Sequence, residues 1–167
     1  MAASAHVDTF ARDRLPAPAD QPEFIFELPE LQFPQRLNCA TALLEQRLDQ
    51  GWGDRRCVIA PDGTVWTYAE LNAQANRIAN VLVHDMGLVP GNRVLLRAAN
   101  SPQLAACWFA VMKAGGIAVG TMPMLRAKEL SQIIDKAQVS HALCDACLLY
   151  TSPSPRDRTR SRMPSSA

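Results

Sequence analysis

The sequence predicts an α/β domain with a mostly parallel sheet and flanking helices, and residues 93–123 supply the main evidence. Residues 94–96 form a short, continuous apolar run, typical of a strand buried on both faces of a parallel sheet. A helical pattern begins at Pro102, and residues 117–119 form a second apolar run. Because a strand–helix–strand crossover of this length joins parallel strands, we expect a parallel pair with a right-handed connection.

The ends of this central helix are marked by residues with known end preferences. Ser101 suits the N-cap, and Pro102 fits the first helical position, where its missing N–H costs nothing. Gly115 and Gly116 are expected to end the helix, since glycine enters the left-handed conformation without a steric penalty. The face predicted to lie on the sheet consists of Leu104, Trp108, Val111 and Met112.

Two helices and a hairpin are predicted before this unit. Asn38 is the expected N-cap of a helix that runs to about Gln50 and ends at Gly51, with a buried face made of Ala40, Leu43, Leu44 and Leu48. Residues 57–60 and 64–67 read as the strands of a hairpin joined by a tight turn at 61–63. Thr67 and Glu70 form a capping box for the next helix, which Gly87 ends. Its apolar stripe is Leu71, Ala75, Ile78 and Leu82, and its outward face is Ala73, Arg77, Asn80 and His84.

After Pro123 the pattern predicts one more helix and one more strand. Ala127, Leu130, Ile134 and Ala137 recur at helical spacing, with Lys128, Gln132 and Lys136 outward. Residues 141–144 read as a short strand. The resulting order β-β-α-β-α-β-α-β favours a layered α/β architecture.

Composition indicates one ordinary globular domain with flanking segments. The chain has 167 residues, of which 48% are hydrophobic and 20% charged, with a formal net charge of +1. Residues 1–146 hold 13 basic and 15 acidic residues, so the body is mildly acidic and carries no electrostatic footprint for nucleic acid. The N-terminus is no secretory signal and the run around Trp108 is broken by Lys113, so neither export nor a membrane span is expected. We therefore expect a cytoplasmic protein.

Three segments are expected along the chain. Residues 1–37 read as an extended arm rich in proline and aromatic residues, with Phe24, Phe26 and Phe33 as the anchors to the domain surface. Residues 38–146 form the α/β domain. At Cys147 periodicity is lost, and residues 147–167 are expected to be disordered and free of fold-specific contacts. This tail also resembles a translated transposase adapter from short-read library preparation, so we interpret it as an artefact appended near Ala146.

Residues that could carry chemistry are sparse. The three histidines, His6, His84 and His141, lie in unrelated elements, and no phosphate-loop, dinucleotide or nucleophile-elbow motif is present. The five cysteines are irregularly spaced, as reduced core cysteines are, and the Cys144/Cys147 pair lacks a metal-spaced partner. Lys113 lies before a glycine pair, but that pair ends a helix, whereas phosphate cradles begin one. Asn100 and Ser101 lie at a strand tip, where open α/β sheets bind ligands, although an N-cap also explains them.

Three blocks in combination resemble the adenylate-forming enzymes. They are TYAEL at 67–71, PGNRV at 90–94, and MKAGG at 112–116 followed by Pro123. This superfamily includes acyl- and aryl-CoA ligases, luciferases and the adenylation domains of peptide synthetases. The leader with LNCA at 37–40 is most similar to the benzoate and 2-aminobenzoate CoA ligases. The resemblance covers roughly residues 20–146 and implies the opening part of the family's N-terminal subdomain.

The resemblance also implies a function for a longer parent protein. Such an enzyme activates a small carboxylic acid with ATP and Mg²⁺ to an acyl-adenylate and then passes the acyl group to CoA. The family's phosphate loop, adenine motif, ribose-binding aspartate and catalytic lysine all come later than this chain extends. We therefore assign no catalytic, cofactor-binding or metal-binding residue here, and we expect the 167-residue chain alone to be inactive.

Two other interpretations stay open at this point. The self-consistent α/β pattern also suits a small, non-catalytic binding module for a nucleotide or a protein partner. A non-functional translation product is the third.

Overall fold

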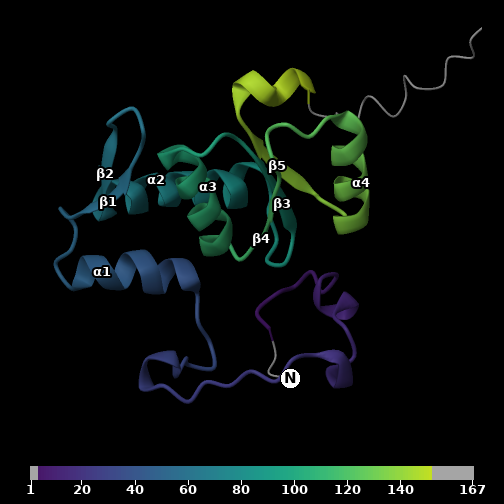
Figure 1. The fold of residues 1–167 in the computed structure, drawn as a ribbon, viewed down its shortest axis with the longest axis horizontal. Coiled ribbons are helices and arrows are strands. Elements are labelled where there is room, and N and C mark those ends of the chain that lie inside the picture. The colour runs from purple at the N-terminus through teal and green to yellow at the C-terminus, as the bar shows by residue number, and fades with distance from the viewer. Residues whose placement is uncertain (1–3, 152–167) are drawn as a thin grey trace, which may run out of the picture.

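The computed structural model describes residues 4–151, and its regular elements follow the predicted order (Figure 1). The strands are β1 (Arg56–Ile59), β2 (Val65–Thr67), β3 (Arg93–Arg97), β4 (Ile117–Gly120) and β5 (His141–Cys144). The α-helices are α1 (Gln46–Asp49), α2 (Tyr68–Asn80), α3 (Pro102–Lys113) and α4 (Ala127–Ala137). Two π-helical turns, Thr41–Glu45 and Val81–Asp85, adjoin α1 and α2, and short 3₁₀ turns occupy Arg12–Arg14, Pro18–Asp20, Pro29–Leu31 and Ala146–Thr151.

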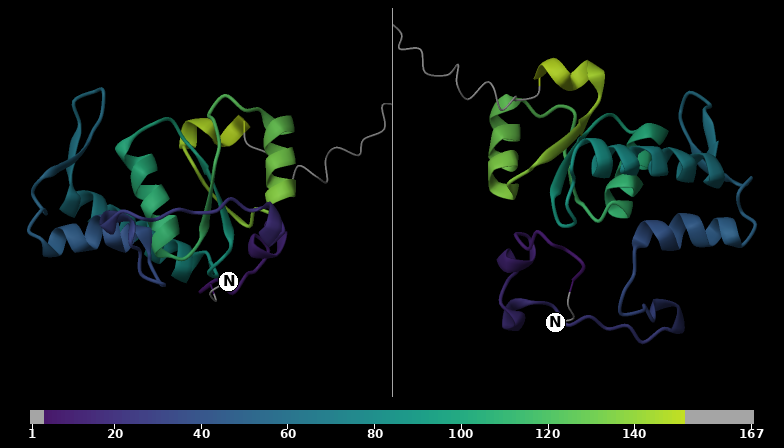
Figure 2. Two further views of the ribbon diagram at one scale, coloured as in Figure 1. Left: turned by 60° about the horizontal axis from the view of Figure 1, so that its bottom comes forward. Right: turned by 180° about the vertical axis from the view of Figure 1, so that it is seen from behind.

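The centre of the molecule is a parallel sheet of order β4-β3-β5. In β3, Val94 lies opposite Ala118 of β4 and His141 of β5, so the predicted parallel crossover is confirmed. The antiparallel pair β1-β2 forms a separate hairpin beside the helices (Figure 2). The α/β class predicted from the sequence is therefore the observed one.

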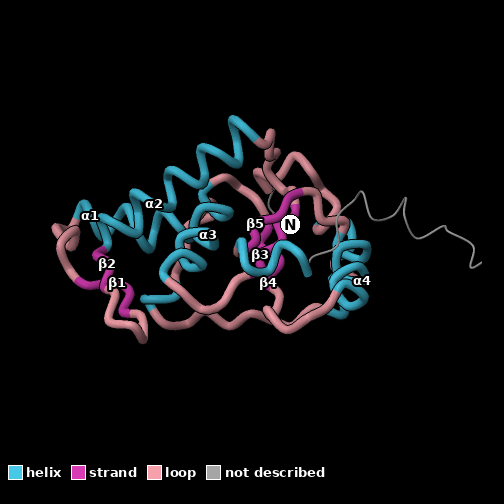
Figure 3. Tube along the Cα trace, turned by 90° about the horizontal axis from the view of Figure 1, so that it is seen from above, coloured by secondary structure: helices cyan, strands magenta, loops and turns pink. Residues whose placement is uncertain are grey.

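The helices cover the sheet from two sides. Figure 3 shows α2 and α3 on one side of the strands and α4 on the other. Val94 and Leu96 of β3 belong to the main core, whose remaining buried members are Leu44, Leu71, Ala75, Leu82, Leu88, Ala106, Ala110 and Val111. Leu95 is also buried and alternates to the opposite face, the side on which α4 lies with its buried Leu130.

The predicted helix ends are confirmed at atomic detail. Thr67 Oγ1 accepts a hydrogen bond from the Glu70 N–H (3.2 Å), and the Glu70 carboxylate accepts one from the Thr67 N–H (2.8 Å). Ser101 Oγ accepts from the Leu104 N–H (3.1 Å) at the start of α3. Gly87 and Gly115 both adopt positive φ, at 68° and 75°, where they end their helices.

The predicted face of α3 is partly wrong. Its buried residues are Pro102, Ala106, Ala110 and Val111, whereas Trp108 is 43% exposed. The small side chains of Ala106 and Ala110 let α3 approach the main core closely, and Trp108 instead lies against Gly120 of the edge strand β4. A broad apolar helix has more than one stripe that could meet a sheet, so periodicity alone did not select the right one.

The prediction for the first helix is right at its cap and wrong for one residue of its buried face. Asn38 is its cap, because Asn38 Oδ1 accepts from the N–H groups of Ala40 and Thr41. The helix continues through the π-helical turn Thr41–Glu45 into α1, and Leu43 is 51% exposed rather than buried. Ala40 and Leu44 are buried as predicted.

The arm over residues 4–37 is extended apart from its short 3₁₀ turns, but the three phenylalanines predicted as its anchors are not buried against the domain. Phe24, Phe26 and Phe33 are 70%, 48% and 57% exposed, and the Phe26 ring packs against the rings of the other two. The arm is attached near Asp8, whose carboxylate pairs with Arg93 at the start of β3.

The expected start of the disordered tail does not coincide with the end of regular structure. Ala146–Thr151 forms a 3₁₀ turn, and the Leu148 carbonyl accepts a hydrogen bond from Arg97 Nη1 (2.9 Å). The prediction that residues 147–167 make no fold-specific contact is therefore wrong at Leu148. Residues 152–167 lie outside the described part of the chain. Among the described residues, no helix has both the length and the apolar character needed to span a membrane.

Candidate functional site

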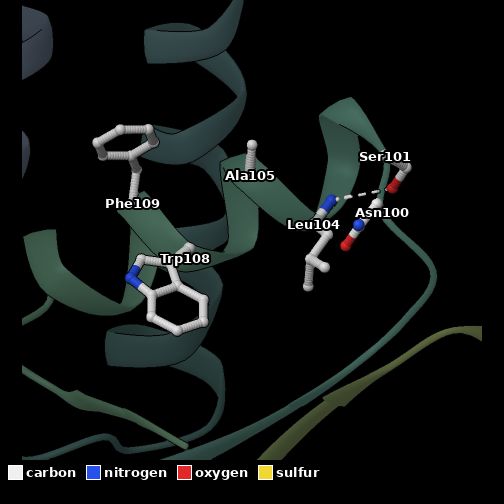
Figure 4. A pocket seen from close by; sticks show the side chains of 6 residues that line it. All are labelled: Asn100, Ser101, Leu104, Ala105, Trp108 and Phe109. Carbon is white, nitrogen blue, oxygen red and sulfur yellow. Dashed lines mark hydrogen bonds between the residues drawn. The ribbon is translucent and has the colours of Figure 1, made fainter. Parts of the chain in front are cut away.

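The best-placed candidate site is the tip of the central strand, where β3 leads through Asn100 and Ser101 into α3. Both residues are exposed. Figure 4 shows Ser101 bonded to the Leu104 N–H, with the side chains of Trp108 and Phe109 further along the helix. This is the carboxyl end of a parallel strand, which is the usual location of ligands in open α/β sheets.

Two hollows flank this tip. The larger, of about 390 Å³, is lined by Asn100, Ser101, Leu104, Ala105, Trp108 and Phe109. The smaller, of about 220 Å³, lies between the tip and the hairpin and is lined by Val58, Ile59, Ala60, Pro61, Asn100, Ser101 and Pro102. None of these lining residues has a side chain that titrates near neutral pH. The hollows can therefore contact an apolar group or another segment of chain, but their side chains offer no general acid, base or nucleophile of raised reactivity.

The glycine pair after α3 has both of its backbone N–H groups engaged within the fold. The Gly115 N–H donates to the Met112 carbonyl (3.1 Å), and the Gly116 N–H donates to the Val111 carbonyl (2.8 Å). A Cβ at Gly116 would meet the Val111 side chain at 3.0 Å and Leu88 at 3.3 Å. Both amides are engaged and the glycine faces packed side chains, so this segment is a helix end and not a cradle for phosphate oxygens.

Lys113 has a more specific environment than the sequence indicated. Its Nζ donates to Glu45 Oε1 (2.5 Å), Asn72 Oδ1 (2.7 Å) and Asn76 Oδ1 (2.7 Å), and its side chain is 8% exposed. These three acceptors use all three ammonium hydrogens. The hydrogen bond from Lys113, opposed by partial burial, holds the pKa of the Glu45 carboxyl below its usual range. Lys113 therefore joins α3 to α2 and to the turn before α1, as a structural cation.

A second engaged cation, Arg97, lies at the end of β3. Arg97 is 1% exposed and donates through Nη2 to the carbonyls of Pro123 (3.1 Å) and Leu125 (2.7 Å). These bonds fix the connection between β4 and α4. With Leu148 as a further acceptor, Arg97 joins the end of β3 to two segments, one that follows β4 and one that follows β5.

The remaining reactive side chains do not converge. Within residues 4–151 no group of three or more His, Cys, Asp or Glu residues is arranged to hold a metal ion. All five cysteines are free thiols, and burial raises the pKa of Cys57 and Cys107, which makes them less reactive. His141 does contact a hydroxyl, because its Nδ1 lies 2.9 Å from Ser140 Oγ, and its Nε2 lies 3.0 Å from the Met86 carbonyl oxygen. The Ser140 hydroxyl also donates to the Arg93 carbonyl (3.3 Å), so the pair is part of the packing at the start of β5.

The sequence did not indicate that Arg93, Arg97 and Lys113 hydrogen-bond oxygens of distant segments and so join the elements of the fold. Both arginines flank the buried run 94–96, and a charge at each end of a buried parallel strand was a usable signal. Asn72 and Asn76 lie four residues apart on one helix flank, which indicates a shared donor, although nothing local identifies Lys113 as that donor.

Comparisons with known proteins agree on one family. The AMP-binding enzyme family matches residues 44–165. The crotonobetaine/carnitine–CoA ligase of Salmonella paratyphi A is 37% identical over 97 residues, which are 56% of this chain and 19% of that enzyme. The N-terminal domain of FACL13 from Mycobacterium tuberculosis is 27% identical, with a TM-score of 0.63 over 75% of this chain and 30% of that one.

A third likeness concerns the fold alone. The anthranilate CoA ligase AuaEII, solved in complex with anthranoyl-AMP, is 23% identical with a TM-score of 0.66, over 79% of this chain and 24% of that enzyme. The chain thus spans about a fifth of the curated relatives' length. Since the family match covers well over half of the chain, this protein belongs to the AMP-binding enzyme family.

Proposed function

We propose that the chain is the opening part of an ATP-dependent acid–CoA ligase, which converts a carboxylic acid to its acyl-adenylate and then to the CoA thioester. The match of residues 44–165 to the AMP-binding enzymes carries this proposal. The CoA ligases among the similar proteins support the choice of reaction. The share of the relatives that the chain spans supports a longer parent protein.

The described residues do not fit a site for ATP and Mg²⁺. Adenylation requires preorganised donors around a triphosphate, and both amides of the glycine pair are already bonded to carbonyls. Lys113, Arg93 and Arg97 are each held by several protein oxygens, so none is placed to neutralise developing charge on a substrate. These residues build a rigid sheet and its helices, and in our proposal the chemistry belongs to later parts of the parent.

For the acid itself we propose an aromatic substrate such as benzoate or 2-aminobenzoate. The proposal rests on the similarity of the leader and of LNCA at 37–40 to the corresponding CoA ligases. The 37% identity with a crotonobetaine/carnitine ligase supports a small acyl acid instead, so both classes belong in the test. The flanking apolar hollows at Asn100 do not discriminate between them.

The test is ATP–pyrophosphate exchange with a panel of acids. We expect no exchange above background from the 167-residue chain with benzoate, 2-aminobenzoate, crotonobetaine or a fatty acid. The complete parent, obtained by extending the reading frame in genomic DNA beyond codon 146, should show exchange with at least one aryl or acyl acid. Strong exchange by the purified 167-residue chain, abolished by Lys113→Ala but not by Lys136→Ala, would overturn the proposal and make Lys113 catalytic.

A further inference from the structure

The start of β3 carries a buried arginine whose position is fixed by the domain itself. Arg93 is 6% exposed. Its Nε donates to the Ala137 carbonyl (3.0 Å), its Nη2 to the Gln138 carbonyl (2.9 Å) and its Nη1 to the Gly91 carbonyl (2.8 Å). Three main-chain oxygens therefore orient the guanidinium without any help from the N-terminal arm.

The Nη1 atom of this guanidinium also donates to the carboxylate of Asp8 in the arm. Asp8 Oδ2 accepts from Arg93 Nη1 (2.5 Å) and from Asn92 Nδ2 (2.9 Å). Asp8 Oδ1 accepts from the Phe10 N–H (3.0 Å), which turns the arm so that the Phe10 ring lies 4.6 Å from the Arg93 guanidinium carbon. One carboxylate thus meets two donors of the domain, and an aromatic ring stacks on the same cation.

The main chain of the arm is recognised as well. The N–H groups of Val7 and Asp8 both donate to the Pro90 carbonyl, at 3.0 and 2.9 Å. Gly91 follows with φ +94°, and a Cβ built on it would lie 2.1 Å from the Asp8 carbonyl oxygen. Any larger residue at position 91 would therefore clash with the arm, so the turn is shaped to let a second backbone approach.

The rest of the arm does not share this attachment. From Leu15 to Leu37 the side chains are almost all exposed. Backbone N–H groups in this stretch donate to carbonyls three residues earlier in the arm, as in Asp20 to Ala17 and Leu31 to Leu28. Figures 1 and 2 show the arm as an irregular chain that runs beside the domain before it enters the first helix. Residues 7–10 therefore contact the domain as a short segment, and residues 15–37 link this segment to the first helix.

We propose that Arg93, Asn92 and the turn at Pro90 and Gly91 form a peptide-binding site for an extended segment with an aspartate followed two residues later by an aromatic residue. Residues 7–10 of the chain occupy this site. The same segment supplied in trans, as from a second copy of the chain, will bind once the chain's own arm is released. This inference does not depend on the proposed ligase activity.

The experiment uses a fluorescent peptide with the sequence of residues 4–14, SAHVDTFARDR, and the full chain carrying Asp8→Asn. The neutral amide cannot supply the charge that pairs with Arg93, so we expect the arm of this variant to be released and the site to be open. In the wild-type chain the tethered arm competes at an effective concentration on the order of millimolar. We expect the peptide to bind Asp8→Asn at least tenfold more tightly than the wild-type chain.

Three controls make each outcome decisive. The chain with Asp20→Asn, which alters an exposed carboxylate of the same arm, should behave as the wild type. A peptide with asparagine in place of Asp8 should bind none of the chains. Gly91→Ala should release the arm and also block the peptide, because the new Cβ occupies the position of the Asp8 backbone.

Hydrogen exchange of the backbone amides completes the design. The amides of Val7 and Asp8 should lose protection in Asp8→Asn and Gly91→Ala, while those of residues 94–96 stay protected and report that each variant is folded. Unchanged protection of Val7 and Asp8 in Asp8→Asn would overturn the proposal. Equal affinity of the two peptides for the opened site, or no binding of the wild-type peptide to it, would also overturn it. If Gly91→Ala fails to fold, the Asp8→Asn comparison alone decides.

Discussion

Three buried cations, each surrounded by protein oxygens, determine how distant segments of this chain meet. Arg93 and Arg97 are held mainly by main-chain carbonyls, and Lys113 by side-chain oxygens. A buried charge is costly unless it is paired and hydrogen-bonded, so each cation requires its partners to be in place. Most of these partners are distant in sequence: Pro123 lies 26 residues from Arg97, and Asp8 lies 85 residues from Arg93. A local sequence pattern could therefore not reveal them.

The Lys113 cluster gives the first prediction at this scale. Lys113→Met keeps the length of the side chain but removes the donor shared by Glu45, Asn72 and Asn76. We expect a loss of about 1–3 kcal/mol in the free energy of unfolding. The loss should lie toward the lower end of this range, because the Glu45 side chain is 44% exposed and Asn76 is exposed, and both can bond to water instead. Urea unfolding measures it. Lys136→Met, on the exposed face of α4, should stay within about 0.5 kcal/mol of the wild type.

The pH dependence of that difference separates the ion pair from simple packing. Lys113 lowers the pKa of Glu45, with Thr41 contributing a weaker hydrogen bond. A carboxyl whose folded pKa is depressed contributes stability above its unfolded pKa, and this contribution is lost as the pH falls through the folded value. The difference between wild type and Lys113→Met should therefore shrink below about pH 4. A difference that is constant from pH 7 to pH 3 would contradict the assignment.

Among the elements, those with local end signals were predictable and those defined by packing were not. The capping box at Thr67, the cap at Ser101 and the positive-φ Gly115 act within a few residues, so the sequence suffices to place them. The face of α3 is decided by Ala106 and Ala110 meeting the core, a tertiary effect that periodicity does not contain. The π-helical turns each carry an extra residue, which shifts the faces of their helices and left Leu43 exposed.

Helix α2 and its continuation offer the test of face assignment. Leu82 is fully buried, so Leu82→Ala should lower the free energy of unfolding by about 2–5 kcal/mol. Arg77 is exposed, so Arg77→Ala should change the free energy of unfolding by no more than about 0.5 kcal/mol. Thermal or urea unfolding of both variants gives the comparison. Similar losses from the two substitutions would show that the helix is rotated relative to the structure.

For the whole molecule, the class of fold was predictable but the place of chemistry was not. The alternation of strands and helices determines the α/β class, and β3 is central because its run 94–96 is apolar on both faces. Within the described residues, β4 and β5 each pair on one side only, and Trp108 stays exposed beside β4. The exposed tip at Asn100 borders a pocket whose lining residues carry no side chain that titrates near neutral pH, so the α/β pattern that determines the fold does not by itself indicate a reaction.

The last prediction concerns the chain beyond Ala146. Its sequence resembles a translated adapter, whereas the family match extends to residue 165 and Arg97 bonds Leu148. The bond from Arg97 uses a main-chain oxygen, which any residue at position 148 supplies, so this contact does not require the present side chain. We expect the source DNA to contain adapter sequence across codons 147–167 and an independent clone to encode different residues there. Identical codons through Ala167 in that clone would refute the artefact, and the tail would then be part of the natural protein.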